Sequence, residues 1–311
     1  MGVIKRAINA GLARLNLRAK LNRRPGAVGL ELRRIRHPGP APELAPIFED
    51  PYEAMCYVQG ERSASFHCPV DKCVTLNGLN FSANGWHPFA AAVTEYLRKT
   101  ANGYEGSVLE RYYEKWRPAN AAEALIDPDS APAAFRELHP CLMYLFPWNA
   151  LTQEQILQGI RQWSLKDYRH YGLDDYDFDK YGFNHHGLVD SRLGRIEWQR
   201  LVRVAESVQQ QGFKRELGQI RVILIKRGHD ARLMVNGGGL HRIAAMRALG
   251  ETSVPATFMH PWIVDVKDVE KWPRVRQVMW SAEQATRYVD HLFDSDARSW
   301  ARDLGILPSL N

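Results

Sequence analysis

The chain has 311 residues, of which 45% are hydrophobic, and its formal net charge is +6. This length holds about two domains, and no apolar run approaches the roughly 20 residues of a membrane-spanning helix, so we expect no transmembrane segment. Four cysteines in a chain this long do not suggest a secreted disulfide scaffold, and we expect a cytoplasmic protein.

The positive charge is concentrated at the N-terminus. Residues 1–36 contain ten Lys or Arg and one Glu, whereas the remaining residues contain 31 basic and 34 acidic side chains. The body is therefore not a basic nucleic-acid surface, and we expect no nucleic-acid partner. Within this segment Ile4, Ile8, Leu12 and Leu15 share one face of a predicted helix.

A basic amphipathic helix of this kind predicts peripheral attachment to an anionic inner membrane. A disordered basic tail, an RNA-binding arm and a helix docked on the protein itself are the alternatives. Residues 37–47 contain four prolines and predict an extended linker.

Residues 48–165 are predicted to be mainly helical, with helices over 88–99, 107–116 and 152–162. Gly85-Trp86-His87-Pro88, Gly106-Ser107 and Pro147-Trp148 precede these helices and are typical of helix starts. Cys68 and Cys73 are too widely spaced for a zinc knot and have no second pair, so we expect no metal site.

Residues 163–187 are rich in Tyr, Asp and His and have no regular apolar period. Such a segment beside a binding core predicts a lid or an acceptor-recognition loop. Asp175-Tyr176-Asp177 also fits the loose Asp-x-Asp motif of glycosyltransferases, although that motif is common by chance.

The next elements frame a glycine run. Trp198, Leu201, Ala205 and Val208 predict one apolar face of a helix that ends at Gly212. Residues 220–226 and 232–236 predict a β-hairpin, residues 243–249 a helix that stops at Gly250, and residues 254–259 a further strand.

The run Asn236-Gly237-Gly238-Gly239-Leu240-His241-Arg242 lies between the hairpin and the helix. Glycines let backbone N–H groups approach an anion closely, and the helix start adds unpaired donors and the positive end of its dipole. The run therefore predicts phosphate binding. The simpler alternative is a tight turn, with His241 as a cap and Arg242 in an ion pair.

After Pro261, helices are predicted over 281–293 and 297–304. They carry no nucleophile, base or metal-ligand pattern, so we interpret them as structural cover over the core.

Residues 183–262 resemble the core of the ParB/sulfiredoxin superfamily in the order of their elements and motifs. The order is a helix, Ser207-Val208-x-x-x-Gly212, a hairpin, Gly-x-His-Arg, a second helix, Leu249-Gly250 and Val254-Pro255. The resemblance implies an α/β (α+β) fold with a small mixed sheet, here embedded in a larger helical frame. That superfamily includes a CTP-dependent partition clamp, a sulfinic acid reductase and a free-serine kinase, all of which bind nucleotide phosphates at the equivalent loop.

Departures from these members narrow the function. Leu240 stands where sulfiredoxin has its cysteine, which disfavours reductase activity. His241 replaces the first arginine of the partition proteins, and the chain that follows is short for their helix-turn-helix domain. The serine kinases share the His-Arg pair but have Asp where this chain has Gly238.

The expected site follows from the chemistry of phosphoryl transfer, which needs positioned cations, backbone donors, usually Mg²⁺ and a group that orients the acceptor. Gly237, Gly238 and Gly239 would hold the phosphates, Arg242 would bind a phosphate oxygen, and His241 would donate to it or transfer a proton. The resemblance adds nucleotide contacts at Asn236 and Ser207. Candidates for the base are Asp190, Glu197 and Glu206, and we favour Asp190.

The leading hypothesis is transfer of a phosphoryl group from ATP or ADP, with Mg²⁺, to a small hydroxyl-bearing acceptor. The alternatives are a non-catalytic module gated by CTP or ATP that binds a membrane or protein partner, and a DNA-acting partition-like protein or nuclease. The layout also resembles proteins of bacterial surface-polysaccharide loci, which suggests a sugar or lipid-linked acceptor, and a homo-oligomer is a further possibility.

The predicted organisation is a basic segment (1–36), a linker (37–47), a helical region (48–165), the nucleotide-binding core (166–262) and a helical cover (263–311).

Overall fold

The computed structural model describes residues 17–21, 30–34, 47–59 and 62–308. The chain divides into two units, residues 1–45 and 46–311. The first contains an antiparallel pair, β1 (Leu17–Leu21) with β2 (Leu30–Arg34). The predicted helix with Ile4, Ile8, Leu12 and Leu15 on one face lies outside the described residues.

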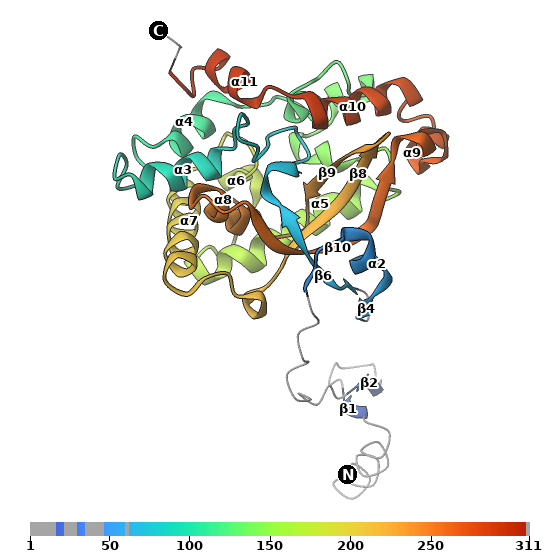
Figure 1. Ribbon diagram of the computed structural model, residues 1–311, viewed down its shortest axis with the longest axis horizontal. Helices are drawn as coiled ribbons and strands as arrows, with labels where there is room; N and C mark the ends of the chain where they lie inside the picture. Colours follow the sequence, from blue (N-terminus) through green and yellow to red (C-terminus); the bar gives the residue numbers. More distant parts are fainter. Residues whose placement is uncertain (1–16, 22–29, 35–46, 60–61, 309–311) are drawn as a thin grey trace, which may run out of the picture. The chain divides into compact units, whose positions relative to one another are not determined.

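A six-stranded mixed sheet organises the second unit, with strand order β3-β6-β10-β8-β9-β7 (Figure 1). Its strands are β3 (Ile47–Phe48), β6 (Ser65–Pro69), β7 (Cys73–Val74), β8 (Ile220–Arg227), β9 (Asp230–Val235) and β10 (Ser253–Asp265). β8 and β9 form the predicted antiparallel hairpin, and β10 runs parallel to β8. A separate short pair joins β4 (Val58–Gln59) to β5 (Arg62–Ser63).

The apolar run at the start of the hairpin explains its central place. Val222, Ile223, Leu224 and Ile225 are all buried, as expected for a strand covered on both faces. The register of β10 against β8 shifts between Phe258 and Ile263, around a proline that has no N–H for the ladder. β10 thereby continues well beyond the predicted strand 254–259.

Helices surround the sheet, and α8 packs against α3 and α7 (Figure 1). The helices are α2 (Pro51–Cys56), α3 (Pro88–Leu97), α4 (Val108–Lys115), α5 (Gln153–Tyr168), α6 (Phe178–Tyr181), α7 (Ser191–Gln211), α8 (Leu240–Ala248), α9 (Pro273–Arg276), α10 (Ala282–Asp294) and α11 (Ala297–Asp303). The 3-10 turns are η1 (Val70–Lys72), η2 (Glu123–Leu125), η3 (Ala133–Glu137), η4 (Pro140–Tyr144), η5 (Arg169–Tyr171), η6 (Arg215–Leu217) and η7 (Val266–Lys271). None of the described helices is long and apolar enough to cross a membrane.

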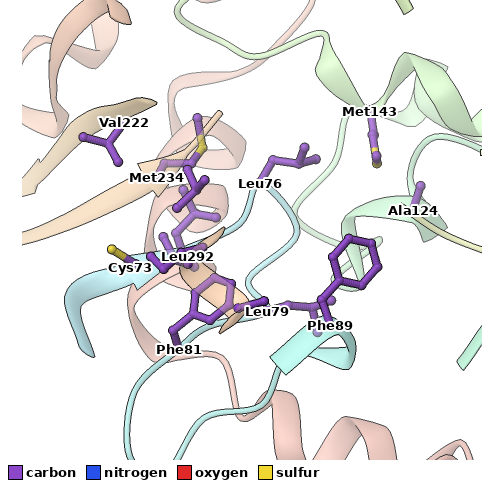
Figure 2. Packing of buried hydrophobic residues seen from close by; sticks show 14 of the residues in the cluster. Cys73, Leu76, Leu79, Phe81, Phe89, Ala124, Met143, Val222, Met234 and Leu292 are labelled. Carbon is purple, nitrogen blue, oxygen red and sulfur yellow. The ribbon is translucent and has the colours of Figure 1, made fainter. Parts of the chain in front are cut away.

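One buried cluster joins the sheet to the helices. Figure 2 shows Cys73 of β7 and Met234 of β9 in the same cluster as Leu292 of α10 and Phe89 of α3. The sulfurs of Cys68 and Cys73 lie 3.4 Å apart in this cluster, and both thiols are free. The helical cover predicted at the C-terminus therefore packs on the sheet edge.

The structure corrects where the segments divide. The region expected to be mainly helical supplies β3, β6 and β7, because short strands far apart in sequence complete the edges of a sheet centred on the hairpin. The boundary expected between residues 165 and 166 falls inside α5, and that between 262 and 263 falls inside β10. The sheet is thus not confined to residues 183–262.

Candidate functional site

The glycine run connects β9 to α8 and has a backbone that requires glycine. Gly237, Gly238 and Gly239 have φ angles of 71°, 132° and 96°, which residues with a side chain rarely adopt. A Cβ on Gly239 would also lie 2.7 Å from Cα of Ile220, so the loop approaches β8 closely. Arg221 N–H donates to Gly238 O at 3.3 Å, which fixes the loop on that strand.

The loop leaves backbone donors open. Gly239 is the N-cap of α8 and provides no side-chain acceptor to the first turn. Among the described residues, no hydrogen bond is made by the N–H groups of Gly237, Gly238, Gly239 or Leu240. Unpaired amides at the positive end of a helix dipole form a site for an anion.

These amides border a cavity of about 820 Å³, a size typical of small-molecule sites. The walls come from the C-terminal half of α7, the loop, the bend of β10 and segments near residues 144–171 and 183–185. The predicted binding residues that line it are Ser207, Asn236, Gly237, Gly238, Gly239, His241 and Arg242. The fold therefore brings this predicted set into one cavity.

The charge of the cavity lining suits an anion. Arg200, Arg203, Lys214 and Arg242 are its basic residues, and Asp167 is the single carboxylate among the described residues that line it. A Cβ on Gly218 would lie 2.7 Å from Nη1 of Arg242, so this glycine makes room for the guanidinium. Burial lowers the pKa of Arg242.

A buried carboxylate lies behind the loop. Glu197 is 0% exposed, and its Oε2 lies 2.8 Å from Nε2 of His241. Arg200 Nη1 donates to Glu197 Oε1 at 2.7 Å, and Asn184 Nδ2 donates to Oε2 at 3.1 Å. Burial raises the pKa of Glu197, but Arg200 and His241 outweigh it and hold that pKa well below its ordinary range.

Glu197 is therefore an ionised anchor and not a base that meets a substrate. It does not line the cavity, whereas His241 does. Its carboxylate orients the histidine, much as a buried acid orients the imidazole of a catalytic triad. The catalytic role of Glu197 stays a prediction, and the structure shows its carboxylate in contact with His241, Arg200 and Asn184.

Asp190, the favoured base, is placed elsewhere. It is the exposed N-cap of α7, and its Oδ1 accepts a hydrogen bond from Arg192 N–H at 2.8 Å. It lines a different cavity of about 500 Å³. Because a helix rises 1.5 Å per residue, Asp190 lies about 25 Å along the axis from Ser207. The preference for Asp190 is thus corrected by the geometry: helix capping explains this acid.

The other acidic candidates also have structural partners. Glu206 accepts a hydrogen bond from the hydroxyl of Tyr96 at 2.6 Å. Asp175 binds Lys180 at 2.7 Å, and Asp177 caps α6 by accepting from Asp179 N–H. The Asp-x-Asp motif is therefore used within its own segment.

Sequence reasoning missed several residues of the cavity. Asn184 and His185 line it and come from the Tyr-, Asp- and His-rich segment, whose density of polar aromatic residues was the available signal. Asp167 and Arg200 are joined by a 2.7 Å ion pair, and no sequence spacing links them.

Known proteins do not extend this description. Comparisons with protein-family models, with curated proteins and with solved structures give no match. The chemistry of the cavity therefore has to be interpreted from its own residues.

Proposed function

We propose that this protein binds a nucleotide through the loop Asn236–Arg242 and transfers a phosphoryl group to a small hydroxyl-bearing acceptor. One observation carries the proposal: loop residues whose amides are unpaired line a cavity together with four basic residues and one carboxylate. That carboxylate, Asp167, is already bound by Arg200. A polyphosphate is the ligand that best matches such a lining.

The order of elements supports the same proposal. α7, the β8–β9 hairpin, the glycine loop, α8 and β10 follow one another as in the ParB/sulfiredoxin cores that the sequence resembles. Leu240 at the position of the sulfiredoxin cysteine favours phosphoryl transfer over reduction. The resemblance remains part of the proposal.

Each residue of the loop has a proposed role that follows from its chemistry. The amides of Gly237–Gly239 bind phosphate oxygens, and the guanidinium of Arg242 forms a charge-assisted fork with one of them. His241 is held by Glu197 through Nε2 and is one of the residues that line the cavity. Preorganised donors of this kind stabilise charge that develops on the transferring group.

The chain offers few ligands for a resident magnesium ion. Mg²⁺ is usually held by one or two carboxylates together with substrate phosphates. Asp167 is engaged by Arg200, and no group of three His, Cys, Asp or Glu suited to a metal occurs among the described residues. The donor set does not fit a protein-held magnesium site, so the roles above rest on the amides and the basic side chains alone.

Thermal unfolding with added nucleotides tests the proposal. ATP, ADP and CTP are compared on the wild-type chain and on Arg242→Ala, with Arg247→Ala as the control. Arg247 lies on the same helix but does not line the cavity. A ligand at 100 times its Kd stabilises a protein by about 2.7 kcal/mol, so a bound nucleotide raises the melting temperature measurably.

We expect that rise in the wild-type chain and in Arg247→Ala, and a much smaller rise in Arg242→Ala. A kinase also consumes nucleotide faster when its acceptor is added, whereas a nucleotide-gated switch binds tightly and turns over slowly. An equal rise in all three proteins would remove Arg242 from the site, and no rise with any nucleotide would refute the proposal.

A further inference from the structure

Two histidines that line the cavity are connected to one buried carboxylate. His241 contacts Oε2 of Glu197 directly, and Asn184 Nδ2 donates to the same oxygen. Oδ1 of Asn184 in turn lies 2.8 Å from Nδ1 of His185. The ring of His185 is thus two hydrogen bonds from Glu197 and three from His241.

This chain of contacts determines the tautomer of His185. An ionised Glu197 can only accept, so the amide nitrogen of Asn184 faces it and the amide oxygen faces His185. That oxygen also only accepts, so Nδ1 of His185 carries the hydrogen. Burial lowers the pKa of His185 to about 3, and neighbouring His186 acts in the same direction, so the ring is neutral near pH 7.

A neutral ring with hydrogen on Nδ1 has a lone pair on Nε2. Within the part of the chain that the structure describes, no hydrogen bond to this nitrogen is found. His185 is only partly buried and lines the cavity. It therefore offers a hydrogen-bond acceptor to a cavity whose unpaired loop amides are donors.

Aromatic rings surround this acceptor. His185 stacks on Phe183 with centroids 4.7 Å apart, and Tyr144 and Trp163 contact it at about 6 Å in edge-on geometry. Trp163 is 36% exposed and lines the same cavity. An aromatic wall beside an acceptor is suited to a compact carbon ring that carries hydroxyl groups.

The charges beside this wall restrict the acceptor further. Asp167 is bound by Arg200, and Arg203 and Lys214 add positive charge to the lining. Among the described residues that line the cavity, no carboxylate remains for an ammonium group. A cationic amino alcohol would meet repulsion there, whereas a neutral or anionic compound would not.

We propose that the acceptor is an uncharged or anionic sugar packed on Trp163, and that His185 Nε2 accepts a hydrogen bond from its reacting hydroxyl and thereby orients it. This inference rests on the proposed phosphoryl transfer. The hydroxyl oxygen forms a bond to the terminal phosphorus as the bond from that phosphorus to its bridging oxygen breaks. The bridging electron pair stays on the nucleoside diphosphate, and the hydroxyl proton leaves to solvent.

The first experiment uses the wild-type chain and needs no variant. Release of ADP from ATP with Mg²⁺ is measured at about pH 6.5 with D-glucose, N-acetyl-D-glucosamine or D-glucosamine as the probe. The amine of D-glucosamine is mostly protonated at that pH. We expect both uncharged sugars to accelerate ADP release at least tenfold more than the cationic sugar.

Variants of His185 test the acceptor group itself. His185→Phe keeps a ring but removes Nε2, and we expect a loss of about 100-fold in the sugar-stimulated rate. His185→Gln places an amide oxygen near the position of Nε2 and should recover part of that loss. His229→Phe, at the exposed turn of the hairpin, is the matched control and should behave as wild type. The ATP-dependent rise in melting temperature should persist in all of them.

The outcomes separate the two proposals. Equal stimulation by D-glucosamine, an unaffected His185→Phe variant, or ATP binding without stimulation by any of the three sugars would overturn the sugar-acceptor inference and leave the nucleotide site standing. No thermal response of the wild-type chain to ATP would overturn the proposed function itself.

Discussion

Replacing Glu197 with glutamine tests the buried network that positions His241. The change removes a charge that Arg200, His241 and Asn184 all contact, and it turns one acceptor oxygen into a donor that faces other donors. Breaking a buried ion pair from one side costs about 3–5 kcal/mol, because the remaining charge stays buried. For a domain of this size, we expect the melting temperature to fall by about 10 °C.

Glu206→Gln is the matched control, because it is the same substitution on the same helix. Among the described residues, Glu206 makes one hydrogen bond, which it accepts from the hydroxyl of Tyr96. The amide oxygen of a glutamine can still accept this bond, so we expect a cost of about 1 kcal/mol or less. Urea unfolding of the two variants and the wild type measures the difference. Equal destabilisation of Glu197→Gln and Glu206→Gln would refute the role given to Glu197.

The same comparison has a pH dependence of known sign. The pKa of Glu197 is lowered in the folded state and about 4.3 in the unfolded chain, so its contribution is complete above about pH 5. Below about pH 4, the difference in unfolding free energy between wild type and Glu197→Gln should shrink by about 1.4 kcal/mol per pH unit. The reason is that the unfolded carboxylate binds a proton there, whereas the folded carboxylate does not. A gap of constant size between pH 7 and pH 3 would contradict an ionised Glu197.

Two further substitutions test the loop and the corrected base. Gly239→Ala places a methyl group on a residue with positive φ and against Ile220, so we expect unfolding free energy to fall by about 1–3 kcal/mol and the nucleotide-dependent thermal shift to be lost. Gly250→Ala is the control, because Gly250 also has a positive φ but has open space around it, and this variant should keep the shift. If both variants lose the shift, the close approach of the loop to β8 is not what shapes the site. Asp190→Ala should lower stability by about 1 kcal/mol through loss of the α7 cap and leave nucleotide turnover unchanged, and a turnover loss of tenfold or more would restore Asp190 as a catalytic residue.

The elements around the glycine loop were predictable because their signals are local. The β-branched run at Ile220–Arg227 specifies a strand, Gly212 and Gly250 end helices, and three consecutive glycines mark a backbone with positive φ. Period and capping depend on residues a few positions apart, so the sequence alone is sufficient for them. Predicted helices near α3, α4, α5, α10 and α11 are confirmed for the same reason.

The base and the acceptor wall were not predictable in that way. Asp190 and Glu197 are both acids near the start of one helix, and their different roles depend on which side of α7 faces α8. His185 acquires its tautomer from Asn184 and Glu197, which lies twelve residues later and on a different element. No spacing rule connects such residues.

The sequence by itself determined the strands, most helices and the glycine turn that exposes backbone donors. Only the tertiary structure decided that Ser207, the glycine loop and the aromatic wall share one cavity, and that Glu197 is a buried anchor while Asp190 is an exposed cap. The physical reason is that backbone conformation is set by neighbouring residues, whereas the ionisation and reach of a side chain depend on burial and on partners that folding brings from distant positions.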